Sequence, residues 1–339
     1  MGRRGQRGTG IVVAAVLLAL AACGGSSGGS DGRGEGSSTT DASTTTTVAA
    51  TAAKDFSGPG VAVIAHRGAS GEAPEHTFAA YDRAVEAGAD YIEQDVQLSA
   101  DGRLVVLHDP SLERTVRGPG EQCTGFVSDH TVEELSACEA GSWFNEANPD
   151  LADSTFDTQT IPTLDQVFDR YRTDTRYYIE VKAPDDQPEM VPTLLDLIEQ
   201  AEADWTDLAP PDPDLPRIVI QSFSADSLRV IHQQRPDLPL VQLIRTGEPV
   251  PDAAALDAIA EYAVAIGPPV ATVTPALVAA ANDRCLDVHP YTIDEPAEMT
   301  AALDAGAGAL FTNDPSTLVD VLKDRPGDTE LCPAPATAD

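Results

Sequence analysis

The segment VIAHRGASGEAPEHT (residues 63–77) indicates how this chain folds and where its chemistry lies. It begins with an apolar run, and buried strands of α/β proteins read as near-continuous apolar runs. The run stops at His66-Arg67-Gly68, where two side chains can donate protons or hydrogen bonds. Because α/β folds place their chemistry at the carboxyl ends of parallel strands, the segment predicts a strand that ends at a functional site.

From residue 61 onward, strand-like runs alternate with helical patterns. After the first run, residues 77–87 carry apolar side chains at helical spacing, with Thr77 as the N-cap and Gly88 just past the end. The later strand-like runs are YIEQDVQL, RLVVLHD, YYIEVK, RIVIQSF, LPLVQLI, YAVAIG, LDVHPYT and GALFTNDP. Helices are expected at 163–171, 189–203, 224–234, 252–261, 275–283 and 296–304. About eight such repeats predict an α/β protein with a closed TIM (β/α)₈ barrel. The alternative, an open doubly wound sheet, is disfavoured because no Gly-rich phosphate loop follows the first strand.

One connection departs from this alternation. Only residues 99–102, which include Asp-Gly, separate YIEQDVQL from RLVVLHD. A parallel crossover needs a dozen or more residues, so these strands are expected to form a hairpin. A two-residue turn would set Asp95 opposite His108, and a four-residue turn would set Glu93 opposite His108. In either register His108 shares a sheet face with both carboxylates.

The amino-terminal region has the features of an export signal. Basic residues precede the apolar run IVVAAVLLALAA, which is too short for a comfortable transmembrane helix, so residues 1–22 are expected to be a signal peptide. The run ends in LAAC, which resembles the lipobox of bacterial lipoproteins and predicts lipidation of Cys23. An ordinary secretory signal with a chance cysteine is the alternative. Either interpretation places the protein outside the cytoplasm, and the first makes it a cell-membrane lipoprotein held through an N-terminal lipid anchor.

The rest of the chain divides by composition. Residues 23–57 are rich in Gly, Ser, Thr and Ala and are expected to be a flexible linker. The barrel is expected to occupy 58–325, with an insertion at about 110–160 after the His108 strand. A tail, 326–339, ends the chain.

The cysteines and the net charge restrict the function further. With Cys23 lipidated, four cysteines remain in an oxidising compartment, and two disulfides are expected. Three pairings are open; proximity in sequence favours Cys123–Cys138 and Cys285–Cys332. The formal net charge of −34 makes nucleic acid a poor partner. Any phosphate chemistry would therefore need a local cation.

Paired carboxylates predict a cation site. Glu93 and Asp95 lie at i and i+2 on one strand, so they point the same way and would repel each other without a cation between them. Glu180 and Lys182 repeat this spacing on another strand, where Glu180 can complete the ligand set and Lys182 can contact an anion. Hard oxygen ligands favour Ca²⁺ or Mg²⁺ over Zn²⁺.

Two histidines at strand ends predict proton transfer. His66 and His108 can serve as a general acid and base near neutral pH, and Arg67 offers a bidentate fork for phosphate. His289 also ends a strand and is a weaker candidate for the site. No role is assigned to the three remaining histidines, His76, His130 and His232. Metal-assisted phosphodiester hydrolysis is the reaction class that uses all of these groups.

At this point a family resemblance can be stated. AHRGASGEAPEHT, DYIEQDVQLSADGRLVVLHDPSLERT, YIEVKAP, VIQSF and TNDP resemble the glycerophosphodiester phosphodiesterase family. VQLI, EYAVAIGP and VHPYT resemble its periplasmic bacterial branch. The resemblance covers roughly residues 61–320 and implies a (β/α)₈ barrel with a divalent metal, Ca²⁺ first and Mg²⁺ as the alternative. It also implies hydrolysis of small-molecule glycerophosphodiesters to sn-glycerol 3-phosphate and an alcohol.

The resemblance also implies roles for individual residues. By motif position, Glu93, Asp95 and Glu180 match the metal ligands. His66 and His108 match the acid–base pair, and Arg67 and Lys182 match the phosphate contacts. Gln221 and Phe223 follow the fifth strand and are expected to line the substrate pocket.

The chain departs from the family pattern at two places. Many members have Thr-Asp where this chain reads Thr312-Asn313, and a common Trp appears here as Tyr291. Two other functions remain open. One is a phospholipase C- or D-like enzyme on the same barrel, which would carry apolar surface loops. The other is a non-catalytic solute-binding lipoprotein, which would lack part of the residue set.

Overall fold

The computed structural model describes residues 60–206, 208, 215–323 and 325. The expected signal peptide, Cys23, the linker, Cys332 and the tail therefore lie outside the described residues, and those predictions stay untested. Among the described helices, none has the length and hydropathy needed to cross a bilayer.

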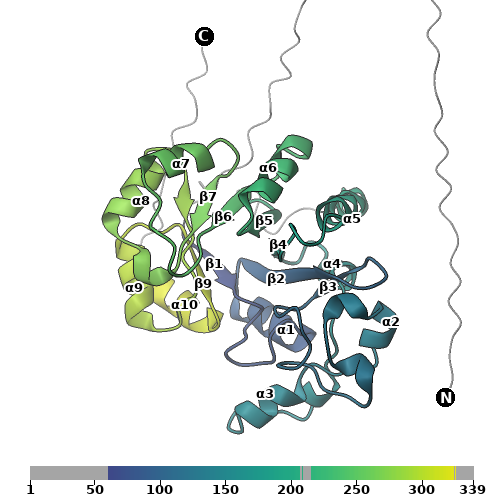
Figure 1. The fold of residues 1–339 in the computed structure, drawn as a ribbon. Helices are drawn as coiled ribbons and strands as arrows, with labels where there is room; N and C mark the ends of the chain where they lie inside the picture. The colour runs from purple at the N-terminus through teal and green to yellow at the C-terminus, as the bar shows by residue number, and fades with distance from the viewer. Residues whose placement is uncertain (1–59, 207, 209–214, 324, 326–339) are drawn as a thin grey trace, which may run out of the picture. The chain divides into compact units, whose positions relative to one another are not determined.

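Eight parallel strands form a nearly closed barrel, with helices around it (Figure 1). The strands are β1 (Ala62–Ala65), β2 (Tyr91–Leu98), β4 (Arg176–Val181), β5 (Ile218–Ser222), β6 (Leu240–Leu243), β7 (Ala265–Gly267), β8 (Asp287–Val288) and β9 (Ala309–Thr312). Their order is β8-β7-β6-β5-β4-β2-β1-β9. The backbone amide of Gly308 donates to Val288 (3.2 Å) and that of Phe311 to Pro290 (3.1 Å), which links the chain at the two ends of this order. The predicted TIM barrel is confirmed.

The expected helices are present, each within two residues of its predicted ends. They are α1 (Phe78–Ala87), α4 (Leu164–Tyr171), α5 (Met190–Asp204), α6 (Ala225–Gln234), α7 (Ala253–Ile259), α8 (Pro275–Asn282) and α9 (Pro296–Asp304). Thr77 caps α1 by accepting from the Ala80 amide, and Gly88 ends it with φ 84°. A further helix that the sequence analysis did not predict, α10 (Pro315–Leu322), begins after Asp314, whose side chain caps it.

The pleat of β2 separates the core from the site. Ile92 and Val96 pack outward in the core between the sheet and its helices. Tyr91 points into the barrel, where its ring meets Tyr178 edge-on at 5.7 Å between centroids. Glu93 and Asp95 share the face of Tyr91 because side chains alternate along a strand. The barrel interior is thus mainly apolar below the site.

The predicted hairpin is confirmed, but both predicted registers are wrong. β3 (Leu104–Val106) runs antiparallel to β2, with Val96 opposite Val106. Ser99 and Arg103 close the turn through a 2.9 Å backbone hydrogen bond, so the loop has three residues rather than two or four. This odd number sets Leu107, not His108, against Asp95 (3.0 Å). His108 lies beyond the end of β3 and reaches the site because the chain leaves the sheet there.

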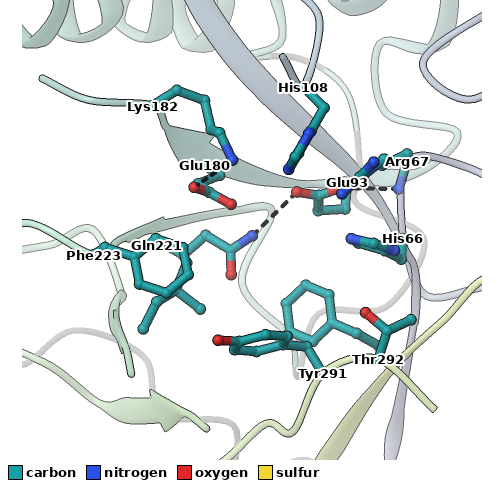
Figure 2. Close-up of a pocket in the computed structure, with 12 residues that line it drawn as sticks. His66, Arg67, Glu93, His108, Glu180, Lys182, Gln221, Phe223, Tyr291 and Thr292 are labelled. Carbon is teal, nitrogen blue, oxygen red and sulfur yellow. Dashed lines mark hydrogen bonds and ion pairs between the residues drawn. The ribbon is translucent and has the colours of Figure 1, made fainter. Parts of the chain in front are cut away.

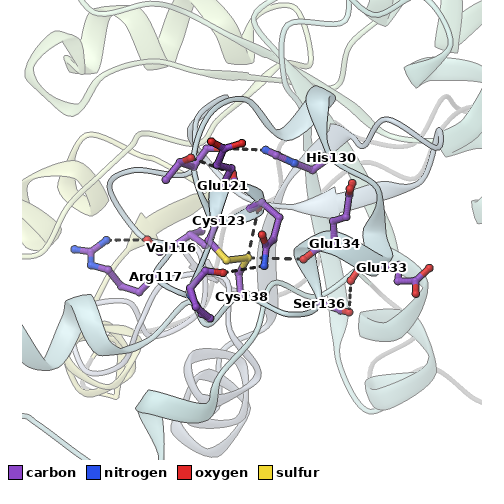
Figure 3. The surroundings of a disulfide bond; sticks show 12 residues. Val116, Arg117, Glu121, Cys123, His130, Glu133, Glu134, Ser136 and Cys138 are labelled. Carbon is purple, nitrogen blue, oxygen red and sulfur yellow. Dashed lines mark hydrogen bonds between the residues drawn. A yellow bond between two sulfur atoms is a disulfide. The ribbon is translucent and has the colours of Figure 1, made fainter.

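The insertion after His108 forms a small structure with its own core. It contains α2 (Val132–Leu135), α3 (Ser142–Ala147) and single 3₁₀ turns at Glu121–Cys123, Val127–Asp129 and Phe156–Thr158. Its buried apolar side chains form one cluster that includes Cys123 and Cys138. These two cysteines are joined by a disulfide (Figure 3). The first predicted pairing is therefore confirmed. The second, Cys285–Cys332, stays a prediction because Cys332 lies outside the described residues.

Candidate active site

A cavity of about 240 Å³ opens at the carboxyl end of the barrel (Figure 2). Its lining residues are His66, Arg67, Glu93, His108, Glu180, Lys182, Gln221, Phe223, Leu243, Tyr291, Thr292 and Phe311. Of the nine site residues predicted from the sequence, all but Asp95 line it. Asp95 is 1 % exposed and lies directly behind the lining, in contact with it through ion pairs.

The turn after β1 explains the His-Arg-Gly sequence. Gly68 has φ 82°, and a Cβ there would lie 2.7–2.9 Å from Ala80 at the start of α1, so only glycine fits. Arg67 also has a positive φ, 61°, which is uncommon outside glycine and typical of functional sites. This conformation aims the Arg67 backbone N–H at Glu93 Oε2, at 2.8 Å. The loop and β2 are thereby tied together at the site.

Three carboxylates converge beneath the cavity. Asp95 and Glu180 are direct neighbours in the β2–β4 register, and Glu93 precedes Asp95 by two residues. The Lys182 ammonium lies 3.5 Å from Asp95 Oδ1 and 3.0 Å from Glu180 Oε1. Arg67 Nε lies 3.6 Å from Asp95 Oδ2. The convergence of Glu93, Asp95 and Glu180 expected from the sequence is present.

The pKa values show that these carboxylates lack sufficient positive charge. Burial, followed by repulsion from Asp95 and Glu180, raises the pKa of Glu93 well above its usual value. Burial and Asp95 likewise raise the pKa of Glu180 to about 8. For Asp95, burial acts in the same direction, but Lys182, His76 and Arg67 outweigh it and hold the pKa well below its usual value. The three acids together thus carry more negative charge than Arg67 and Lys182 compensate.

His76 is a site residue that the sequence analysis missed. It is 1 % exposed, its Nε2 lies 2.8 Å from Asp95 Oδ2, and its Nδ1 lies 3.0 Å from the Tyr81 hydroxyl. The sequence analysis assigned His76 no role, and this was wrong. His76 lies in a loop before α1, and its partner Asp95 follows 19 residues later on β2. His76, Glu93 and Asp95 can each bring one ligand atom within 4.8 Å of the others.

The residues around the carboxylates fit a divalent cation. All three acids offer hard oxygen atoms, and Asp95 Oδ1 is buried without a hydrogen-bond donor among the described residues. The Gln221 side chain donates to Glu93 Oε1 at 3.2 Å, while its own Oε1 is buried and also lacks a partner there. The Nε2 atom of His76 is already hydrogen-bonded to Asp95, so His76 orients that carboxylate.

His66 is held by a neutral amide. Its Nδ1 lies 2.8 Å from Asn313 Oδ1, and the Asn313 Nδ2 donates to Asp294 at 2.7 Å. Because an amide nitrogen only donates, the carboxylate of Asp294 fixes the amide orientation, and His66 Nδ1 must carry the proton. His66 Nε2 is then left as an acceptor. Burial, followed by the charge of Arg67, lowers the pKa of His66 to about 3, which keeps the ring neutral.

His108 is held by a carboxylate. Its Nδ1 lies 2.6 Å from Asp109 Oδ1, and Arg114 Nε donates to Asp109 Oδ2 at 2.5 Å. Arg114 also grips Glu75 with two hydrogen bonds of 2.7 Å, and Glu75 accepts a third from Arg67 at 3.0 Å. Burial lowers the pKa of His108, and Asp95 and Asp109 act against that shift. A charged network therefore links the loop after β1 to the insertion through His108.

The remaining wall of the cavity is aromatic. The rings of Phe223 and Tyr291 meet edge-on at 6.2 Å, and the Tyr291 hydroxyl donates to the Ile244 carbonyl at 2.6 Å. Tyr291 thus fills the place where the family pattern has a Trp. His289, the weaker candidate, is not part of this lining. It is fully buried between Tyr178 (2.8 Å) and Asp287 (3.0 Å).

Comparison with known proteins identifies the family. Residues 66–317 match the model of the glycerophosphoryl diester phosphodiesterase family. The chain belongs to this family. A glycerophosphodiester phosphodiesterase of Bacillus subtilis is 39 % identical over 264 residues, which is 78 % of this chain and 87 % of the relative. One from Caldanaerobacter subterraneus is 34 % identical, over 77 % of this chain and 97 % of the relative.

A crystal structure from Silicibacter pomeroyi, described as a glycerophosphoryl diester phosphodiesterase, has the same barrel. It superposes with a TM-score of 0.66 at 26 % identity, covering 80 % of this chain and 96 % of that one. The family, the barrel and the enzyme class predicted from the sequence are thereby confirmed. As a family member the chain is a phosphodiesterase.

Proposed function

We propose that the chain hydrolyses glycerophosphodiesters to sn-glycerol 3-phosphate and an alcohol, with a divalent cation and a histidine pair. The observation that carries the proposal is a single cavity in which two differently held imidazoles face undercompensated carboxylates. Arg67 and Lys182 supply fixed positive charge at the same cavity. Their side chains are 17 % and 18 % exposed, so each can reach a bound phosphate.

Glu93, Asp95 and Glu180 are the residues that would hold the cation, with His76 orienting Asp95. When bound, the cation neutralises the carboxylates and polarises the phosphoryl oxygens. Oxygen ligands favour Ca²⁺, with Mg²⁺ as the alternative. The family's own mechanism and this donor set agree on the ligands, while the identity of the metal is part of the proposal.

The two histidines have different roles in this proposal. His66, neutral and with Nε2 as an acceptor, removes the proton from the attacking hydroxyl. By the family resemblance, this hydroxyl is the substrate's own glycerol group. Asp109 bonds to His108 and favours its imidazolium form, against the burial that lowers the pKa of this ring. His108 donates a proton to the oxygen of the alcohol as its bond to phosphorus breaks. Water then opens the cyclic phosphodiester with the proton transfers reversed, which restores both rings.

Product release with and without chelator tests the proposal. Glycerol 3-phosphate is measured enzymatically from several glycerophosphodiesters, before and after dialysis against EDTA and after return of Ca²⁺ or Mg²⁺. Glu93→Gln should weaken the metal titration, because it removes a charged ligand. The exposed Glu199→Gln on α5 is the matched control. Release of glycerol 3-phosphate that persists after chelation, with an unchanged metal titration in Glu93→Gln, would exclude the metal role.

We also propose that Cys23 anchors the enzyme to the outer face of the cell membrane. The support is the sequence alone: a basic start, a short apolar run and LAAC before a stretch rich in Gly, Ser and Thr. Incorporation of a labelled fatty acid into the full chain, and its loss in Cys23→Ser, would support the anchor. Secretion of an unlabelled wild-type chain would contradict it.

A further inference from the structure

A second cavity of about 600 Å³ lies beside the first. The two cavities share four lining residues, which are His108, Glu180, Lys182 and Phe223. They therefore adjoin each other at His108. The insertion, the loop between β4 and α5, and the loop between β5 and α6 form its walls. His66 lines only the smaller cavity. The space around the reacting phosphate is therefore asymmetric.

Given the proposed function, on which this inference rests, the asymmetry indicates which cavity binds each arm of the diester. His66 works on the glycerol arm, so that arm occupies the smaller cavity. His108 gives its proton to the oxygen of the other arm, and His108 opens onto the larger cavity. We propose that the larger cavity binds the leaving alcohol and fits a neutral polyhydroxylated alcohol that is larger than glycerol, such as a cyclitol.

The charges in the walls favour a neutral group. Asp185 and Asp186 come from the β4–α5 loop, and Lys182 and Arg245 are the basic side chains around the same space. The Asp185 carboxylate accepts from Ser224 Oγ at 2.8 Å, and the Arg245 guanidinium lies over the Phe223 ring at 4.6 Å. Glu180 is a third acid of this lining and is assigned to the cation in the proposed function. Two acids and two bases remain, so neither a cationic nor an anionic alcohol is favoured. Their mixed donors and acceptors are suited to hydroxyl groups.

Phe126 supplies an apolar face for such an alcohol. It is 56 % exposed at this cavity, and among the described residues its ring meets no other aromatic ring. Its backbone is nevertheless fixed, since the next amide, that of Val127, donates to Pro110 at 2.9 Å and the Cys123 disulfide lies three residues away. A fixed, uncovered ring is a stacking surface for the C–H face of a polyol ring.

The relative size of the two cavities points the same way. If the glycerol arm occupies about 240 Å³, a space of about 600 Å³ exceeds what ethanolamine or choline would fill. Phe126 of the insertion and the acidic residues Asp185 and Asp186 line this same space.

Initial rates with defined diesters test this proposal. The metal-loaded enzyme is assayed on glycerophosphoinositol, glycerophosphocholine and glycerophosphoethanolamine. We expect the highest kcat/KM for the inositol ester. Phe126→Ala should lower that value about three- to tenfold and leave the ethanolamine ester within about twofold, as expected for loss of one stacking contact. Phe126→Trp should restore it.

Leu151→Ala is the control, because Leu151 is an exposed apolar side chain of the same insertion that does not line the cavity. Ser128→Trp, which fills the cavity, should reduce turnover of the inositol ester selectively. Preference for the choline or ethanolamine ester, or equal effects of Phe126→Ala on all esters, would overturn the inference. Failure to release glycerol 3-phosphate from any ester would instead overturn the proposed function.

Discussion

The loop that follows β1 and the insertion that follows β3 each bring one histidine to the same cavity, but they hold it differently. His66 extends a barrel strand and bonds to the neutral amide of Asn313. His108 lies past the end of a short antiparallel strand and bonds to the carboxylate of Asp109. Among the described residues, no hydrogen bond engages the Nε2 atom of either ring. Because the rings are the same and their partners differ, the proposed division into a proton acceptor and a proton donor depends on the partner of each ring.

Removal of either imidazole is the largest expected effect. His66→Ala and His108→Ala should each lower kcat by about 10²- to 10⁴-fold on ordinary alkyl diesters, since one proton transfer is lost in each. The thermal midpoint of unfolding should stay near that of the wild type. His130→Ala, which removes a half-buried histidine of the insertion that does not line the cavity, is the control for the loss of an imidazole. Wild-type turnover in either site variant would remove the acid–base assignment.

Loss of the disulfide is expected to affect the insertion and to leave the barrel unchanged. Cys123→Ser/Cys138→Ser should destabilise the insertion by about 3 kcal/mol, because the bond closes a loop with a sequence separation of 15. Hydrogen exchange should accelerate in residues 110–160 and stay slow in β1 and β9. Unchanged exchange throughout the insertion would show that the core around Leu112 and Leu135 holds it without the bond.

Substitution of the hydrogen-bond partners Asp109 and Asn313 should change the protonation of His108 and His66 in opposite directions. Asp109→Asn removes the charge behind His108 and should lower kcat about 10- to 100-fold, with a smaller effect on KM. Asn313→Asp places a charge behind His66, favours its imidazolium form and should also lower kcat. An unchanged kcat in both variants would show that Asp109 and Asn313 do not determine the protonation of the two histidines.

Arg114 is expected to have the smallest effect because it acts through Asp109. Arg114→Gln should lower kcat about three- to tenfold and Arg114→Lys less, since the guanidinium is 41 % exposed and screened by solvent. Arg83→Gln, which loses an ion pair with Glu72 at 3.7 Å, is the matched control. Equal effects of Arg114→Gln and Arg83→Gln on kcat would show that Arg114 acts only as a surface charge and not through Asp109.

The barrel and most of the site could be predicted from the sequence because both depend on local patterns. Alternating strands and helices specify the barrel, and polar residues after apolar runs mark its carboxyl end, as for His66 and Glu93. The register of the hairpin could not be read, because a loop of three residues and one of two or four have the same Asp-Gly signal. His108 nevertheless lies at the site, as predicted, because β3 ends at Val106 and the chain leaves the sheet before His108.

Other features depend on contacts between distant parts of the chain. His76 lies in a polar loop, and its positive φ of 57° and its bond to Asp95 appear only in three dimensions. Asn313 was recognised as a departure from the family, but its partner is 247 residues away. A signal for His76 was present in the sequence: it directly precedes the cap of α1, next to the acid Glu75.

A substrate whose leaving group needs no proton tests the central claim most directly. The p-nitrophenyl ester of glycerol phosphate releases a stable anion, so a general acid gives it little help. The account predicts that His108→Ala recovers to within about tenfold of the wild-type rate on this ester, while His66→Ala stays reduced by about 10²-fold or more. Recovery of His66→Ala instead, or equal loss in both variants, would contradict the division of roles between the two loops.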